Sequence, residues 1–133
     1  MQYKTGDILV VPTKPIGIFE HYGIVYYVGE IGYVAHNSFT SGKVISTPLN
    51  EFLSGRKLLR VIPSKSFVSD AMIYDKVKLL NGNNVKYNFF GFNCEEFVKD
   101  VCLCDIGTID QRREFAILAV IILSIVLVLL ILK

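Results

Sequence analysis

The segment Gly91-Phe92-Asn93-Cys94-Glu95-Glu96-Phe97-Val98 decides the fold, because it predicts a helix that begins at a cysteine. Asn93 is a favourable helix N-cap, and Glu96 three residues later completes a capping-box pattern. Apolar residues then recur at helical spacing, at positions 97, 98, 101 and 102. Cys94 is therefore predicted to lie in the first turn of an amphipathic helix.

A cysteine at a helix N-terminus is a candidate nucleophile. The unpaired backbone N–H groups and the positive end of the helix dipole stabilise a thiolate, so we expect a pKa below the usual value of roughly 8.5. A nucleophilic thiol also needs an imidazole to accept its proton, and the chain has two histidines, His21 and His36. The alternative is that Cys94 is a buried, unreactive residue acting as a small hydrophobic side chain.

The C-terminal end of the chain has a different composition. Residues 115–132 carry no charge, and Ser124 is their single polar side chain. Such a helix rises about 27 Å, close to the roughly 30 Å hydrocarbon core of a bilayer. With Arg112 and Arg113 before it, no signal-peptide pattern at the start and Lys133 at the end, the sequence predicts a single-pass tail anchor and a cytosolic N-terminal domain.

The remaining segments predict an α+β domain with an antiparallel sheet. Strand patterns occur at residues 7–11, 21–28, 33–36, 43–47 and 57–62. A short helix is expected after Thr47 and Pro48 as N-cap and first residue, ending at Gly55. A longer helix from Ser69 to about Leu80 is expected to bury a broad apolar face, formed by Met72, Ile73, Tyr74, Val77, Leu79 and Leu80. The predicted boundaries are residues 1–111 for the domain and 112–133 for the anchor.

Several functional classes are disfavoured by composition. The net charge of +2 and the lack of a basic stripe argue against nucleic-acid binding. Three cysteines do not form a disulfide framework and are expected to be reduced. Cys102 and Cys104 lack the spacing of zinc ligands, and no glycine-rich phosphate loop is present, so neither a metal nor another cofactor is expected.

Four segments together resemble the lecithin:retinol acyltransferase-like family: Gly6-Asp7-Ile8, His21-Tyr-Gly-Ile with Tyr27-Val28-Gly29, Val34-Ala-His36, and Asn93-Cys94-Glu95-Glu-Phe97-Val98. That family includes small membrane-anchored phospholipase A/acyltransferases and belongs to the NlpC/P60 group of circularly permuted papain-like folds. The resemblance implies that Cys94 is the nucleophile, His21 the general base and His36 the residue that orients the base. It also implies a membrane phospholipid as substrate.

Two positions depart from the family pattern. Glu96 stands where the family usually has histidine, and we interpret it as part of the helix cap. The spacing between His21 and His36 is also wider than usual. A hairpin turning through residues 29–32 would place His36 opposite Val25, about 13 Å along the strand from His21. A β-bulge would close that gap; otherwise Ser38 or Thr40 would take the orienting role.

The leading hypothesis is therefore a membrane-anchored thiol phospholipase A/acyltransferase that acts on glycerophospholipids through a cysteine thioester. Two alternatives remain. One is an amidase or peptidase of the NlpC/P60 group. The other is a non-catalytic membrane adaptor with the same fold, which the wide histidine spacing favours.

Overall fold

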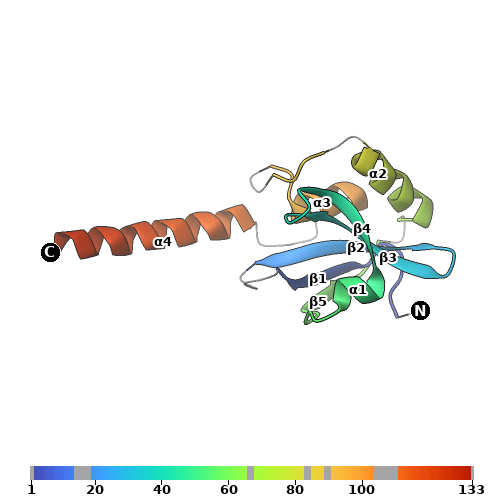
Figure 1. Ribbon diagram of the computed structural model, residues 1–133, viewed down its shortest axis with the longest axis horizontal. Coiled ribbons are helices and arrows are strands. Elements are labelled where there is room, and N and C mark those ends of the chain that lie inside the picture. The colour runs from blue at the N-terminus through green and yellow to red at the C-terminus, as the bar shows by residue number, and fades with distance from the viewer. Residues whose placement is uncertain are drawn as a thin grey trace.

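The computed structural model describes residues 2–13, 19–65, 68–82, 85–88, 91–103 and 111–132, the side chains of residue 82 and residues 111–115 excepted. The chain forms a mixed α+β domain followed by a separate helix (Figure 1). In chain order the elements are β1 (Ile8–Pro12), β2 (Glu20–Val28), β3 (Ile31–Ser38), β4 (Lys43–Pro48), α1 (Leu49–Leu53), β5 (Arg60–Ile62), α2 (Asp70–Gly82), α3 (Cys94–Cys102) and α4 (Gln111–Ile131).

The strands form one antiparallel sheet in the order β4-β3-β2-β1-β5. The central hairpin β2–β3 turns through two residues, because Val28 pairs directly with Ile31. Gly29 has φ +61°, the positive value that a two-residue hairpin loop requires at its first position. The pairing of β2 with β3 ends at Ile24 and Ala35, and the rest of β3 pairs with β4 alone.

Each face of the sheet carries its own apolar cluster. On one face, α2 and α3 pack over side chains of β1, β2, β3 and β4, including Tyr22, Ile24 and Ala35. On the other face, Phe52 of α1 packs against the side chains of the intervening strand positions, including Val25 and Val34. Since successive strand residues point to opposite faces, neighbouring positions in β2 and β3 belong to different clusters.

The predicted fold class, an α+β domain with an antiparallel sheet, is confirmed. Each of the five predicted strands appears with shifted ends; the last is the short β5 rather than residues 57–62. Cys104 lies outside the described residues, and so does the part of the predicted domain from residue 105 to residue 110.

Three local predictions were wrong. The apolar face of α2 is narrower than expected, because Ile73 and Val77 are buried whereas Met72, Tyr74 and Leu79 are exposed. Thr47 does not cap α1: it belongs to β4, and the N-cap position is Pro48. The hairpin turn has two residues instead of four, so the register differs by two positions from the predicted one.

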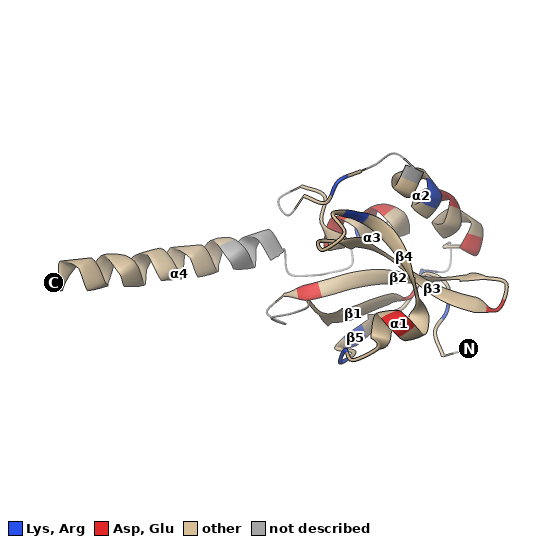
Figure 2. Cartoon of the chain, viewed as in Figure 1, with Lys and Arg blue, Asp and Glu red and all other residues tan. Residues whose placement is uncertain are grey.

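The C-terminal helix α4 extends away from the domain (Figure 1). Its described side chains from residue 116 onward are exposed and include no charged residue, as Figure 2 shows. The hydroxyl of Ser124 donates to the carbonyl oxygen of Val120 at 2.8 Å, within the helix. Within the described residues, no helix is long and apolar enough to cross a membrane.

Candidate active site

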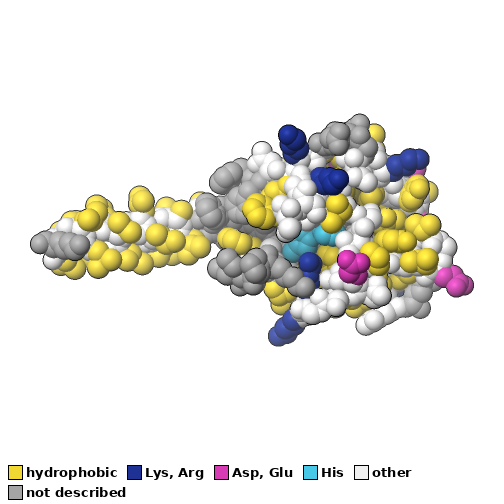
Figure 3. Space-filling view, viewed as in Figure 1, with side chains coloured by type: hydrophobic (Ala, Val, Ile, Leu, Met, Phe, Trp, Pro, Cys, Tyr) yellow, Lys and Arg dark blue, Asp and Glu magenta, His cyan; other side chains and the backbone are white. Residues whose placement is uncertain are grey.

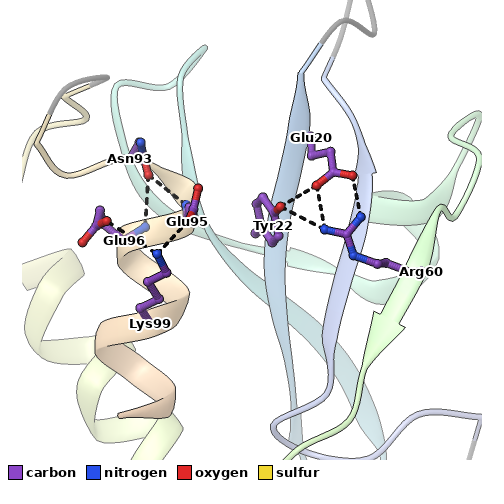
Figure 4. A network of polar contacts seen from close by, with 7 residues as sticks. All are labelled: Glu20, Tyr22, Arg60, Asn93, Glu95, Glu96 and Lys99. Atoms are coloured by element: carbon purple, nitrogen blue, oxygen red, sulfur yellow. Dashed lines mark hydrogen bonds and ion pairs between the residues drawn. The ribbon is translucent and has the colours of Figure 1, made fainter. Parts of the chain in front are cut away.

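Helix α3 begins at Cys94 because Asn93 caps it, as the sequence predicted. The side-chain oxygen of Asn93 accepts hydrogen bonds from the backbone N–H groups of Glu95 and Glu96, both at 3.0 Å (Figure 4). One turn further, Lys99 donates to the buried carboxylate of Glu95 at 2.7 Å. This arrangement fixes the first turn of the helix and with it the position of the thiol.

The Cys94 thiol is buried against the beginning of β2. Its Sγ atom donates to the carbonyl oxygen of Glu20, with the two atoms 3.9 Å apart. Burial raises the pKa of Cys94 to about 11, although hydrogen bonds from the backbone of Tyr22, Cys94 and Glu95 act in the opposite direction. The sequence-based expectation of a lowered pKa was therefore wrong, because loss of solvent outweighs the helix N-terminus.

An ion pair holds the strand segment that the thiol contacts. Arg60 of β5 donates to both carboxylate oxygens of Glu20, at 2.5 and 2.7 Å, and the Tyr22 hydroxyl donates to the same carboxylate (Figure 4). The hydrogen bond from Arg60 is the largest cause that lowers the pKa of Glu20. The residues on either side of His21 are thus tied to the far edge of the sheet, which orders the backbone at this position.

The structure brings the two histidines together. His21 Nε2 lies 2.9 Å from His36 Nδ1, and their rings meet edge to face with centroids 4.9 Å apart. The other nitrogen of His36 lies 2.9 Å from the hydroxyl oxygen of Thr47. These three residues form a hydrogen-bonded chain across β2, β3 and β4, and they lie on the same face of the sheet as Phe52.

The two-residue turn explains why the histidines meet. Continuing the observed register places His36 opposite Gly23, two positions closer to His21 than predicted. Diagonal neighbours in an antiparallel pair are within reach of long side chains, so a bulge is not required. Neither alternative orienting residue takes this place: the Ser38 hydroxyl accepts from the backbone of Ser41, and Thr40 is exposed.

The two histidine side chains pack against the aromatic ring of Phe52. The ring of Phe52 lies 5.9 Å from the His21 ring and 5.1 Å from the His36 ring, measured between centroids. Gly23 makes room for it, since a Cβ there would lie 2.3 Å from Val34 Cγ1 and 3.1 Å from the Phe52 ring. His21 is half-buried and His36 is buried, and histidine atoms are visible at the surface beside a basic side chain in Figure 3.

Both imidazoles are neutral near physiological pH. Burial, followed by the neighbouring His36 and the positive charge of Arg56, lowers the pKa of His21 to about 3. Burial and Arg56 likewise lower the pKa of His36 to about 4. A neutral imidazole has one N–H group and one lone pair, so this pair can accept a proton at one nitrogen while donating from the other.

The thiol and the imidazoles approach the same strand from different sides. His21 points toward Phe52, whereas the neighbouring Tyr22 belongs to the cluster of Cys94 under α3. In the described part of the chain, no hydrogen bond joins the Cys94 thiol to either imidazole; the thiol instead contacts the backbone one residue before His21. Catalytic hydrogen bonds are often long or absent without substrate, so this geometry is compatible with a working pair.

Sequence analysis missed two residues that position the site. Asn37 is fully buried, and its amide nitrogen donates to the carbonyl of Phe92 at 2.7 Å, which ties β3 to the segment before Cys94. Its position directly after His36 was the available signal. Thr47, assigned to a helix cap, instead hydrogen-bonds His36, and only the strand pairing reveals that contact. In the described residues, no cluster of three or more His, Cys, Asp or Glu side chains could hold a metal ion.

Residues 1–107 match the family described as lecithin retinol acyltransferase. The chain belongs to this family. Membership indicates acyltransferase or phospholipase-type activity in lipid metabolism, and it agrees with the resemblance seen in the motifs around His21, His36 and Cys94. A comparison with curated proteins finds no significant match.

Proposed function

We propose that this lecithin retinol acyltransferase family protein is a cysteine-dependent phospholipase A/acyltransferase that acts on glycerophospholipids. Cys94 is the nucleophile, His21 the general base and His36 the residue that orients the base. The observation that carries the proposal is the chain from His21 through His36 to Thr47, placed beside the strand backbone that the Cys94 thiol contacts. Its scaffold would be the permuted papain-like fold implied by the resemblance.

The first half-reaction uses the free nitrogen of His21. When His21 Nε2 donates to His36 Nδ1, the lone pair of His21 Nδ1 is available for the thiol proton. The sulfur of Cys94 forms a bond to the ester carbonyl carbon as that proton leaves. The carbon–oxygen bond of the ester then breaks, and the imidazolium gives its proton to the departing lysophospholipid oxygen.

The second half-reaction reverses the roles. Water, or the hydroxyl or amine of an acceptor, attacks the thioester carbonyl and gives its proton to His21. The carbon–sulfur bond breaks, and the thiolate recovers a proton. Since the resting groups are a thiol and a neutral imidazole, proton transfer accompanies attack instead of preceding it.

Backbone N–H groups support the oxyanion formed in each step. The N–H groups of Tyr22 and Cys94 both face the sulfur, where they favour its negative form. A carbonyl attacked by that sulfur would present its oxygen to the same donors. Each donor of this kind is worth roughly 2.7–4 kcal/mol of transition-state stabilisation in enzymes that cleave acyl bonds.

Membrane association completes the proposal. Residues 1–111 form the catalytic domain, and residues 112–133 hold it at a membrane with the domain in the cytosol. The support is the exposed, uncharged surface of α4 and the apolar sequence 115–132. Tethering the nucleophile at the interface raises its effective concentration toward esters that lie there.

Substitution of the cysteines tests the enzyme assignment. Cys94→Ala should abolish release of fatty acid from phosphatidylcholine in vesicles, whereas Cys102→Ala, which removes another buried thiol, should retain it. Mass spectrometry of the wild-type protein should detect one acyl group attached to Cys94. Equal activity of the Cys94→Ala and wild-type proteins would overturn the assignment.

A non-catalytic membrane adaptor is the second candidate. The raised pKa of Cys94 favours it, and so does the lack of a described hydrogen bond from its thiol to either imidazole. In that case wild-type protein would form no acyl adduct on Cys94 in the same vesicles. The adduct measurement therefore decides between the two candidates without reference to turnover.

A further inference from the structure

Arg56 carries hydrogen-bond donors that nothing in the described protein satisfies. Its Nε and Nη1 atoms are buried, and neither has a hydrogen-bond partner. The described ion pairs engage Arg60, Lys76 and Lys99 with carboxylates and do not include Arg56. A guanidinium remains charged at any physiological pH, and leaving a partly buried charge unpaired is costly.

This guanidinium belongs to the surroundings of the histidine pair. Its central carbon lies 5.0 Å from the centroid of the Phe52 ring, the same ring on which His21 and His36 rest. Its positive charge is close enough to lower the pKa of both imidazoles. Arg56 lies just beyond the short helix α1, and Gly55 before it has φ +65°. The side chain is thus placed by Phe52 beside the proposed general base.

The unused donors fit an oxyanion. The planar fork of a guanidinium matches two oxygens of a phosphate or carboxylate, and stacking on an aromatic ring fixes its orientation before the ligand arrives. The described contacts of Arg56 include no carboxylate of this chain, so its Nε and Nη1 donors have no acceptor among the described residues. A glycerophospholipid carries one such group, its phosphodiester, a few bonds from the ester that the proposed reaction cleaves.

We infer that Arg56 binds the phosphodiester of the substrate and thereby sets the preference of this site for phospholipids over neutral acylglycerols. The inference rests on the proposed function, because it takes the substrate from there. It adds a specificity-determining residue outside the motifs that carry the family resemblance.

Binding can be measured without turnover, on the full chain in nonionic detergent with its histidine side chains labelled with ¹⁵N. Glycerophosphocholine has the phosphodiester but no acyl chain, and inorganic phosphate is the comparison ligand. Glycerophosphocholine should shift the imidazole signals of wild-type protein and of Lys57→Gln, a neighbouring exposed charge. Arg56→Gln should need at least about tenfold more ligand, because two charge-assisted hydrogen bonds are lost. Arg56→Lys should need a ligand concentration between those of wild type and Arg56→Gln.

The second measurement compares the rates at which the protein hydrolyses a phospholipid and a neutral acylglycerol. The ratio of diheptanoyl phosphatidylcholine to diheptanoylglycerol hydrolysis should fall at least about tenfold in Arg56→Gln and hold in Lys57→Gln. Equal binding by wild type and Arg56→Gln overturns the inference, as does a shift by inorganic phosphate with none by glycerophosphocholine, which marks a site for free phosphate. If wild-type protein cleaves neither ester, the proposed function fails, and the binding arm still decides whether Arg56 holds a phosphodiester.

Discussion

His21 Nε2 lies 2.9 Å from His36 Nδ1, so the two imidazoles share one proton between these nitrogens. The hydroxyl of Thr47, 2.9 Å from the other nitrogen of His36, can act as donor or acceptor. The proposed mechanism needs the direction in which His21 donates to His36 and His36 donates to Thr47, because it leaves the lone pair of His21 Nδ1 free for the thiol proton. The role of Thr47 is to accept the last hydrogen bond of that chain.

Replacing Thr47 with valine should therefore lower turnover. Valine keeps the β-branched shape but leaves His36 without its second hydrogen bond, and a buried unsatisfied donor costs roughly 1–3 kcal/mol. We expect kcat to fall about tenfold or more, with a change in the ¹⁵N shifts that report the His21 tautomer. Thr47→Ser keeps the hydroxyl and should therefore retain both the wild-type kcat and the wild-type ¹⁵N shifts. Ser46→Ala is the matched control, since the Ser46 hydroxyl bonds Tyr26 on the opposite face; a similar loss there would mean that β4 is simply destabilised.

Alkylation of Cys94 should have an alkaline pH profile. Burial raises its pKa to about 11, so the iodoacetamide rate should keep increasing above pH 9 in a Cys102→Ala/Cys104→Ala background that isolates one thiol. A midpoint well below the reference value of roughly 8.5 would contradict the buried, neutral thiol and indicate a preformed ion pair with an imidazole. Adding a phospholipid analogue during the titration would show whether substrate lowers the midpoint.

Acid should destabilise the fold through the histidines. Burial lowers the pKa of both, to about 3 for His21 and about 4 for His36, from an unfolded value of 6.5. As the pH decreases below 6.5, the unfolded chain therefore binds more protons than the folded one. The free energy of unfolding decreases along with the pH until the pH reaches the pKa values of the folded state. Each histidine contributes a slope of up to about 1.4 kcal/mol per pH unit.

Urea unfolding between pH 7 and 4.5 measures that slope. His21→Gln removes one of the two titrating groups and should flatten the dependence on pH. Substitution of the exposed Lys57 by glutamine, which has no part in the pair, should leave the dependence as in wild type. Parallel curves for His21→Gln and wild type would show that His21 is not the group being titrated.

Features set by local sequence were predictable. Asn93 and the helical spacing after it identified α3 and its first residue, and Gly55 marked the end of α1. The pattern of apolar and aromatic residues located β2 and β3. The turn between them was assigned four residues because glycines flank it on both sides. One of these, Gly29, provides the positive φ for a two-residue loop, while Gly32 pairs with Tyr27 within the hairpin.

Features set by packing between distant segments were not predictable. The raised pKa of Cys94 depends on how deeply its thiol is buried in the folded protein. A capping motif does not determine that burial. The contact of Thr47 with His36 requires the β3–β4 register. The unpaired donors of Arg56 emerge only when Phe52 is placed under the histidines. The motifs therefore identified the chemical groups, and the sheet register determined which of them meet.

Gly23→Ala should disturb the histidine pair and reduce stability. The new Cβ would lie 2.3 Å from Val34 Cγ1 and press on the Phe52 ring, and overpacking of this kind typically costs about 1–3 kcal/mol. Val34→Ala in the same chain removes the clashing methyl and should recover part of the loss. Gly91→Ala, whose Cβ would make ordinary contacts of 3.4 Å with Asn88, should change the free energy of unfolding much less. Equal losses in both single variants would contradict the close packing described for Gly23.

The proposed membrane association through α4 can be tested with a charge in the middle of the helix. Leu127 is exposed within an uncharged run, and a charge near the middle of a spanning helix costs roughly 2.5–3.5 kcal/mol on insertion scales. Leu127→Arg should therefore shift the protein from vesicles to the aqueous fraction in a flotation assay, whereas Leu127→Ala, at the same position, should remain bound. The site residues lie far from α4 in the sequence, so cleavage of a water-soluble ester should persist in Leu127→Arg while cleavage of long-chain phosphatidylcholine in vesicles falls. If both variants float with the vesicles and keep the same ratio of the two activities, α4 does not present the nucleophile to the membrane, and its exposed apolar surface is covered in some other way.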